Sequence, residues 1–116
     1  MFDVINDLYA VILSRKESAA EGSYTGYLFR EGLDKILKKV GEESSETIIA
    51  AKSLQADAAD AGKRADLANE VCDLLYHLLV LLAERDVPLE EVEEILRARA
   101  EKQGNLKEQK VIDKNS

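Results

Sequence analysis

Apolar residues recur at helical spacing through most of this chain, and this feature constrains the fold more than any other. From residue 2 to 16, from about 33 to 55 and from about 65 to 85, they repeat every three or four positions, the period of one helix face. One proline and six glycines interrupt the 116 residues, which are rich in the helix formers Ala, Leu, Glu and Lys. The sequence therefore predicts an all-α protein, a bundle of four to five helices.

Breaks in this spacing divide the chain into elements. The glycine-rich stretch 16–32 is predicted to be a loop with at most short helical pieces. Pro88 suits the first turn of a further helix, which we expect to end near Ala100. Residues 1–100 are thus predicted to form one domain, and residues 101–116 a polar, disordered tail.

The longest apolar run, LLYHLLVLLA, indicates burial against a second copy of the protein. It has about ten residues, far fewer than the roughly 20 needed to cross a bilayer, so no membrane span is expected. From Leu78 to Leu82 the helix is apolar on every side and must be covered all round. A chain this short offers little cover of its own, so we expect a homodimer.

Charge and cysteine content exclude several classes of function. The net charge of -7 leaves no basic footprint for nucleic acid, so DNA and RNA are not expected partners. Cys72 is the single cysteine and cannot form an intrachain disulfide. No charged leader followed by an apolar core opens the chain, so the expected location is the cytoplasm.

The stretch GEESSE gathers acidic side chains on one helical surface. Glu42, Glu43 and Glu46 lie three or four residues apart, so they meet on one side of the predicted helix. Ile49 and Ala50 continue the row that carries Glu46, which leads us to expect Glu46 to point toward the interior. Acidic neighbours at this spacing also occur on solvated helix faces, and that alternative stays open.

A second acidic pair favours a metal site. Glu70 and Asp73 lie three apart within a leucine seam of the next long helix. Ionised carboxylates that face one another away from water require a compensating cation. Ligands that are all oxygen favour Mg²⁺, which also leaves positions for substrate phosphate. Four lysines could bind phosphate beside these acids: Lys35, Lys38, Lys39 and Lys52.

Two further groups have open roles. Tyr24 and Thr25 place hydroxyls in the glycine-rich stretch, where they could contact a ligand or serve only as loop residues. His77 has no second histidine or cysteine companion nearby, so we expect a core or interface residue rather than a metal ligand.

Two longer stretches resemble a known family. SYTGYLFREGLDKILKKVGEESSETIIAAK, followed by LANEVCDLLYHLLVLLAERDVPLEEV, closely resembles the phosphoribosyl-ATP pyrophosphatases, which belong to the all-α nucleoside triphosphate pyrophosphatases. The resemblance implies a helical homodimer that uses Mg²⁺ to hydrolyse phosphoribosyl-ATP to phosphoribosyl-AMP and pyrophosphate, the second step of histidine biosynthesis.

The same resemblance implies roles for individual residues. Glu42 is implied to orient or deprotonate the attacking water, with the alternative that it is itself a metal ligand. The implied metal ligands are Glu43, Glu46, Glu70 and Asp73. The implied substrate-binding residues are Ser23, Tyr24, Thr25, Lys38, Lys39 and Lys52.

Other functions compete with this hypothesis. A house-cleaning pyrophosphatase acting on a deoxynucleoside triphosphate shares the acidic signature. A non-catalytic helical dimer that serves as a binding partner would carry the same acids as a solvated face. A di-iron carboxylate bundle needs Glu-x-x-His pairs, and the sequence has none.

Overall fold

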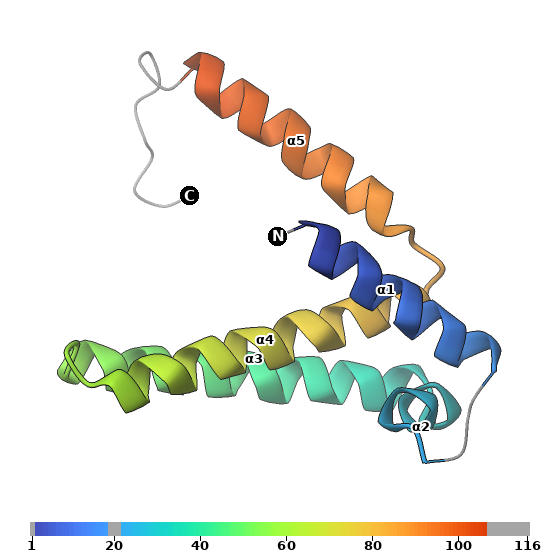
Figure 1. Ribbon diagram of the computed structural model, residues 1–116, viewed down its shortest axis with the longest axis horizontal. Coiled ribbons are helices and arrows are strands. Elements are labelled where there is room, and N and C mark those ends of the chain that lie inside the picture. The colour runs from blue at the N-terminus through green and yellow to red at the C-terminus, as the bar shows by residue number, and fades with distance from the viewer. Residues whose placement is uncertain (1, 19–21, 107–116) are drawn as a thin grey trace.

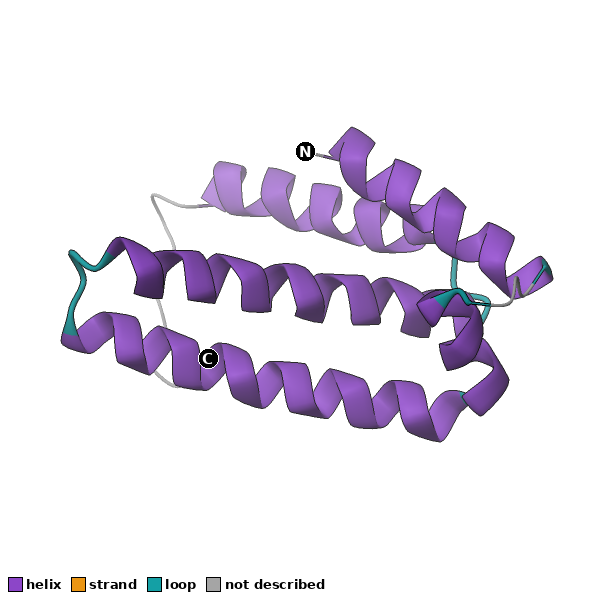
Figure 2. Ribbon diagram, turned by 60° about the horizontal axis from the view of Figure 1, so that its bottom comes forward, coloured by secondary structure: helices purple, strands orange, loops and turns teal. Residues whose placement is uncertain are grey.

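All regular structure in the described part of the chain is helical. The computed structural model describes residues 2–18 and 22–106, and Figures 1 and 2 show only helices there. The prediction of an all-α protein is confirmed, with five helices in this part of the chain. They are α1 (Phe2–Glu17), α2 (Tyr24–Glu31), α3 (Leu33–Ala56), α4 (Ala61–Glu84) and α5 (Leu89–Leu106).

The helices α3 and α4 form a long antiparallel pair that carries the acidic residues. Each has 24 residues, about 36 Å of helix at the usual rise per residue. They lie side by side in both ribbon views. The Asp60 side chain caps α4 by accepting a hydrogen bond from the Lys63 backbone N–H at 3.1 Å. This cap starts the helix at Ala61, four residues before the predicted start.

The apolar core lies at one end of this pair, where α1 and α2 pack against it. Its most completely buried side chains come from four helices. Gly32 joins α2 directly to α3 with a φ of 94°, a left-handed value that favours glycine. The stretch predicted to be a loop with short helical pieces therefore contains α2. The turn at Gly32 places α2 beside the start of α3 (Figure 1). The largest fully buried side chains are Ile12, Leu28, Ile36, Leu79 and Val80.

Side chains of α1 hold the end of α4. Asp86 follows α4 with a φ of 56°, and the Val87 backbone N–H donates to the Leu82 carbonyl at 2.9 Å. The Lys16 ammonium donates to the Ala83 carbonyl and to the Asp86 carboxylate, each at 2.7 Å. These bonds satisfy carbonyl groups that a helix end otherwise leaves without partners.

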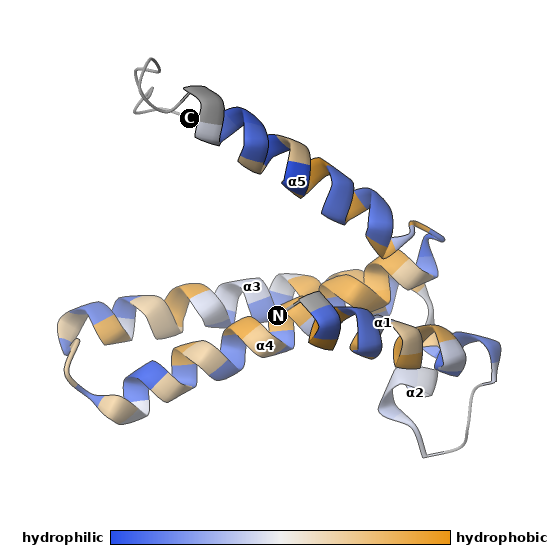
Figure 3. Cartoon of the chain, turned by 45° about the horizontal axis from the view of Figure 1, so that its top comes forward, coloured by the Kyte–Doolittle hydropathy of each residue, from blue (hydrophilic) through white to orange (hydrophobic). Residues whose placement is uncertain are grey.

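The last helix, α5, diverges from the other four. Leu89 is buried and Val92 packs on the core, but beyond them α5 extends away (Figures 1 and 3). The radius of gyration is 17.2 Å, against about 13 Å for a compact domain of this length. The helix was predicted to end near Ala100, but α5 continues to Leu106, so the predicted helix was too short. Residues 107–116 of the predicted tail lie outside the described residues.

Apolar side chains remain open to solvent along α4. Val71, Leu75 and Leu78 are each more than a third exposed, and their spacing of four and three puts them on one stripe. Complete burial of the predicted apolar run is therefore not reached within one chain. None of the helices in the described ranges combines the length and hydropathy needed to span a membrane.

Candidate active site

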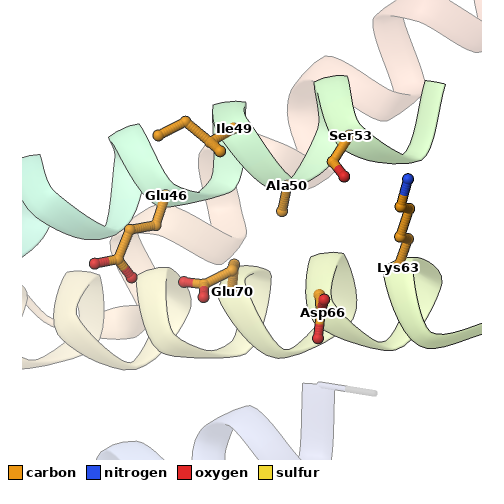
Figure 4. Close-up of a pocket in the computed structure, with 7 residues that line it drawn as sticks. All are labelled: Glu46, Ile49, Ala50, Ser53, Lys63, Asp66 and Glu70. Atoms are coloured by element: carbon orange, nitrogen blue, oxygen red, sulfur yellow. The ribbon is translucent and has the colours of Figure 1, made fainter. Parts of the chain in front are cut away.

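Three carboxylates converge between α3 and α4. Glu43, Glu46 and Glu70 each offer an oxygen atom, and these atoms lie within 4.8 Å of one another. Figure 4 shows Glu46 and Glu70 reaching toward each other from the two helices. The prediction that acids of neighbouring helices face each other is confirmed for these three residues.

The structure changes two details of the predicted acidic cluster. Glu43 is the buried member, with 7% of its surface exposed, whereas Glu46 is exposed. The expectation that Glu46 points into the interior was wrong, because Ile49 one turn further is itself 67% exposed and no core lies behind that row. Asp73 is exposed and does not belong to the close group, although its charge acts on Glu43 and Glu70.

Crowding raises the pKa of two of these acids. Burial, more than the nearby charges of Glu46 and Asp73, raises the pKa of Glu43. The pKa of Glu70 is raised to about 7, first by a hydrogen bond shared with Glu46, then by burial and by the surrounding carboxylates. With a pKa of about 7, Glu70 is about half protonated at neutral pH.

The donor set fits a hard divalent cation. Glu43 Oε2 and Glu70 Oε2 are buried and accept no hydrogen bond from any group in the described residues. A buried carboxylate oxygen without a donor is costly, and a cation would satisfy it. All the converging atoms are carboxylate oxygens, which suits Mg²⁺ and does not suit metals that prefer nitrogen or sulfur ligands.

Lysines lie on one side of the acids. Lys39 Nζ is 3.3 Å from the Glu42 carboxylate and 3.9 Å from that of Glu43, so it links the half-buried Glu42 to the buried Glu43. Lys38 lies 4.0 Å from Glu42 and is mostly exposed. Lys52 points elsewhere, since its ammonium donates to the Gln55 side chain and it does not line the groove described next.

A groove runs from Glu46 and Glu70 along the helix pair. Its volume is about 290 Å³, and Figure 4 shows it between α3 and α4. Lys63 reaches across it from α4 toward Ser53 on α3 and is the only cationic residue among those that line it. Lys63 forms no ion pair within the described ranges, so its charge is free for an anionic ligand. The remaining lining residues are Ile49, Ala50 and Asp66.

Side chains at the start of α2 form hydrogen bonds with side chains of α4. Ser23 caps α2, its hydroxyl accepting a hydrogen bond from the Gly26 backbone N–H at 3.1 Å. The Tyr24 hydroxyl lies 3.0 Å from His77 Nε2, and the Thr25 hydroxyl bonds that of Tyr76. Each of the three hydroxyls expected near the substrate thus bonds within the protein, and Tyr24 is the exposed one of the three residues.

Sequence reasoning missed Lys63 and Tyr76. Lys63, Asp66 and Glu70 are spaced by three and four residues, so the helical period places Lys63 on the face of the acids. That signal was available in the sequence. The bond between Tyr76 and Thr25 joins residues 51 positions apart and has no local signal.

Comparison with known proteins identifies the family of the chain. A sequence model described as phosphoribosyl-ATP pyrophosphohydrolase matches residues 5–100, most of the chain. The chain belongs to this family. The match includes all the acids discussed above and ends within α5.

Individual members of the phosphoribosyl-ATP pyrophosphohydrolase family are about half identical to this chain. A protein of Clostridium novyi, named phosphoribosyl-ATP pyrophosphatase, is 52% identical over 105 residues, which cover 90% of this chain and 88% of its own length. Proteins of the same name from Listeria welshimeri and Streptococcus sanguinis are 52% and 49% identical over 110 residues, covering 95% of this chain and 98% of theirs. The likeness therefore extends over nearly the whole length of each relative.

Proposed function

We propose that this protein hydrolyses phosphoribosyl-ATP to phosphoribosyl-AMP and pyrophosphate with Mg²⁺, in histidine biosynthesis. The observation that carries the proposal is the buried Glu43, whose unpartnered oxygen meets Glu46 and Glu70 between two helices. Membership of the family and the names of the relatives support this substrate over the deoxynucleoside triphosphates of house-cleaning enzymes. The cytoplasm is the proposed location, because the pathway uses nucleotides and phosphoribosyl compounds made there.

The burial of Glu43 also argues against a non-catalytic binding module. Such a module would carry its acids on a solvated face, where each like-charged pair costs only roughly 0.2–0.5 kcal/mol. Here one carboxylate is nearly removed from water and two of them have buried oxygens without donors. A protein retains such a group most readily where it binds a ligand.

In the proposed mechanism, Glu43, Glu46 and Glu70 would hold the metal, and Asp73, on the next turn of α4, would be a further ligand. When bound, Mg²⁺ supplies charge neutralisation for the phosphates and lowers the pKa of a water molecule. Lys38 and Lys39 lie beside the acids and bind phosphate oxygens. Lys52 points away from the groove and would have to change its side-chain conformation to do the same.

Glu42 is proposed to take the proton from the attacking water. Its carboxylate is held by Lys39 at 3.3 Å, outside the close group of three acids. The ion pair keeps Glu42 at the edge of the site, within a helical turn of Glu43 and Glu46. Water is added across the bond between the α and β phosphates, and pyrophosphate leaves.

A second copy of the chain is proposed to cover the exposed apolar stripe of α4. Val71, Leu75 and Leu78 form this stripe, and α5 stands away from its own bundle with Ile95 and Leu96 about half exposed. A dimer could bury both surfaces. Leu75→Glu should then shift the mass measured by light scattering from two chains to one, while an unchanged mass would exclude this face from the interface.

The function is tested by measuring pyrophosphate release from phosphoribosyl-ATP and from a panel of ribo- and deoxyribonucleoside triphosphates, with and without Mg²⁺. We expect turnover of phosphoribosyl-ATP alone, only with the metal. Glu43→Gln should lower it about 10- to 100-fold, the scale on which loss of supporting metal-site groups acts. Glu94→Gln, the same change on an exposed residue of α5, is the matched control. Turnover of the panel but not of phosphoribosyl-ATP would reject the substrate assignment.

A further inference from the structure

His77 connects the start of α2 to the helical turn that carries Asp73. Its Nε2 lies 3.0 Å from the Tyr24 hydroxyl, and its Nδ1 lies 2.7 Å from the Asp73 backbone carbonyl. It is only 5% exposed, so water does not compete for either nitrogen. A bridge of two hydrogen bonds thus runs from α2, through the imidazole, to α4.

The chemistry of the partners fixes the direction of both bonds. A carbonyl oxygen only accepts, so Nδ1 carries the proton and donates to Asp73. In the neutral ring Nε2 is then the acceptor, and the Tyr24 hydroxyl donates to it. Asp73 lies one turn before His77 in α4, so the bond at Nδ1 sets the orientation of the imidazole relative to its own helix.

Neighbouring aromatic rings prevent the imidazole from turning. The Tyr76 ring meets it edge-on at 5.0 Å between centroids, and the Tyr24 ring does so at 5.9 Å. The Tyr24 ring also stacks with those of Tyr27 and Tyr76, each at 6.2 Å. Tyr24 nevertheless stays 47% exposed, so part of its ring is open beside the site while its hydroxyl is engaged.

An open tyrosine ring of this kind suits a flat aromatic ligand. Nucleobases stack on aromatic side chains, and the contact depends on where the ring is held. We propose that His77 is a positioning residue which, through its hydrogen bond to the Tyr24 hydroxyl, holds the Tyr24 ring as the surface that receives the purine of the substrate. This inference rests on the proposed function for the identity of the substrate, but not for the bridge itself.

The two nitrogens of His77 can be tested separately. His77→Asn places an amide near the position of Nδ1, which keeps the bond to Asp73 and loses the acceptor for Tyr24. His77→Gln places an amide near Nε2 and keeps that acceptor. Tyr24→Phe removes only the hydroxyl. Tyr27→Phe is the matched control, because the Tyr27 hydroxyl bonds no group in the described part of the chain.

We expect Tyr24→Phe and His77→Asn each to raise KM about tenfold, or about 1.4 kcal/mol, with kcat changed less than about twofold. The double variant should show about the same tenfold increase, because both changes remove one bond. His77→Gln should stay within about threefold of the wild-type KM. Independent effects that multiply to about a hundredfold, or a loss confined to kcat, would overturn the proposal.

A second measurement does not depend on the substrate. Hydrogen exchange of the α2 amides should become faster in Tyr24→Phe and His77→Asn but not in Tyr27→Phe, while exchange in the middle of α3 is unchanged. If the wild-type protein fails to cleave phosphoribosyl-ATP, the proposed function fails, and this measurement still decides whether His77 holds α2. Equal α2 exchange in all variants would refute the bridge.

Discussion

Binding of Mg²⁺ should depend on pH near neutrality, because Glu70 is partly protonated there when the metal is absent. The pKa of Glu70 is about 7, raised first by the hydrogen bond shared with Glu46. A metal ligand must be deprotonated, so the ion has to displace this proton. The metal-free protein then carries about 0.9 of a proton here at about pH 6, about 0.5 at about pH 7 and about 0.1 at about pH 8.

These fractions set the size of the effect. The apparent Kd for Mg²⁺ rises above its limiting value about elevenfold at about pH 6, about twofold at about pH 7 and about 1.1-fold at about pH 8. Affinity should therefore increase about tenfold between the lowest and the highest of these pH values. A screened surface carboxylate of ordinary pKa would already be ionised throughout this range and would give no such slope.

Titration calorimetry in buffers of different ionisation enthalpy measures both the affinity and the protons released. Glu70→Gln and Glu46→Gln should bind the ion more weakly and lose the slope, because the introduced amide can donate to the remaining acid without a proton to lose. Glu94→Gln on the exposed face of α5 should keep the wild-type slope. A wild-type affinity that is flat between about pH 6 and 8, or a slope that persists in Glu70→Gln, would refute the raised pKa of Glu70.

Three further predictions concern stability and product binding. Burial raises the pKa of Glu43, because the folded protein disfavours the charged carboxylate. The folded state is therefore most stable with respect to this group below the pKa of Glu43 in the unfolded chain, and it loses that stability as pH rises through the folded pKa. Glu43→Gln should therefore raise the Tm of the metal-free protein more at about pH 8 than at about pH 5. Leu28→Ala, at a fully buried position, should lower the free energy of unfolding in urea by about 2–5 kcal/mol. Lys63→Gln should weaken inhibition by pyrophosphate about tenfold, and Lys52→Gln should weaken it less, because only Lys63 lines the groove.

Helical period predicted the fold well because it is a local property of the sequence. The long pattern over 33–55 became α3 almost without change, since propensity and apolar spacing agree along it. Boundaries were less well predicted where a cap or a polar extension decides them. Because Asp60 caps α4, this helix begins before its predicted start. The helix α5 extends past Ala100 into sequence that has no apolar spacing.

The site was only partly predictable because its geometry depends on contacts between helices. The spacing of Glu43 and Glu46 indicates a shared face, but it does not tell which of them the partner helix buries. The bonds from Tyr24 and Thr25 to α4 join residues more than 50 positions apart, and no local pattern reports them. The roles of Glu42 and Asp73 as base and ligand remain predictions.

The buried acids are tolerable because other parts of the fold stabilise the helix pair. Glu43 and Glu70 lie near the middle of α3 and α4, while the apolar core and the bonds from Tyr9 and Lys16 secure the end where α4 stops. Strain from like charges can then be confined to the middle of the pair without separating the helices. A ligand that binds only the folded state raises the free energy of unfolding by about 2.7 kcal/mol when it is present at a hundred times its Kd. The region around residues 43–46 and 70, where the ion and the phosphates are proposed to bind, should consequently be less rigid in the metal-free protein than in the metal-bound protein.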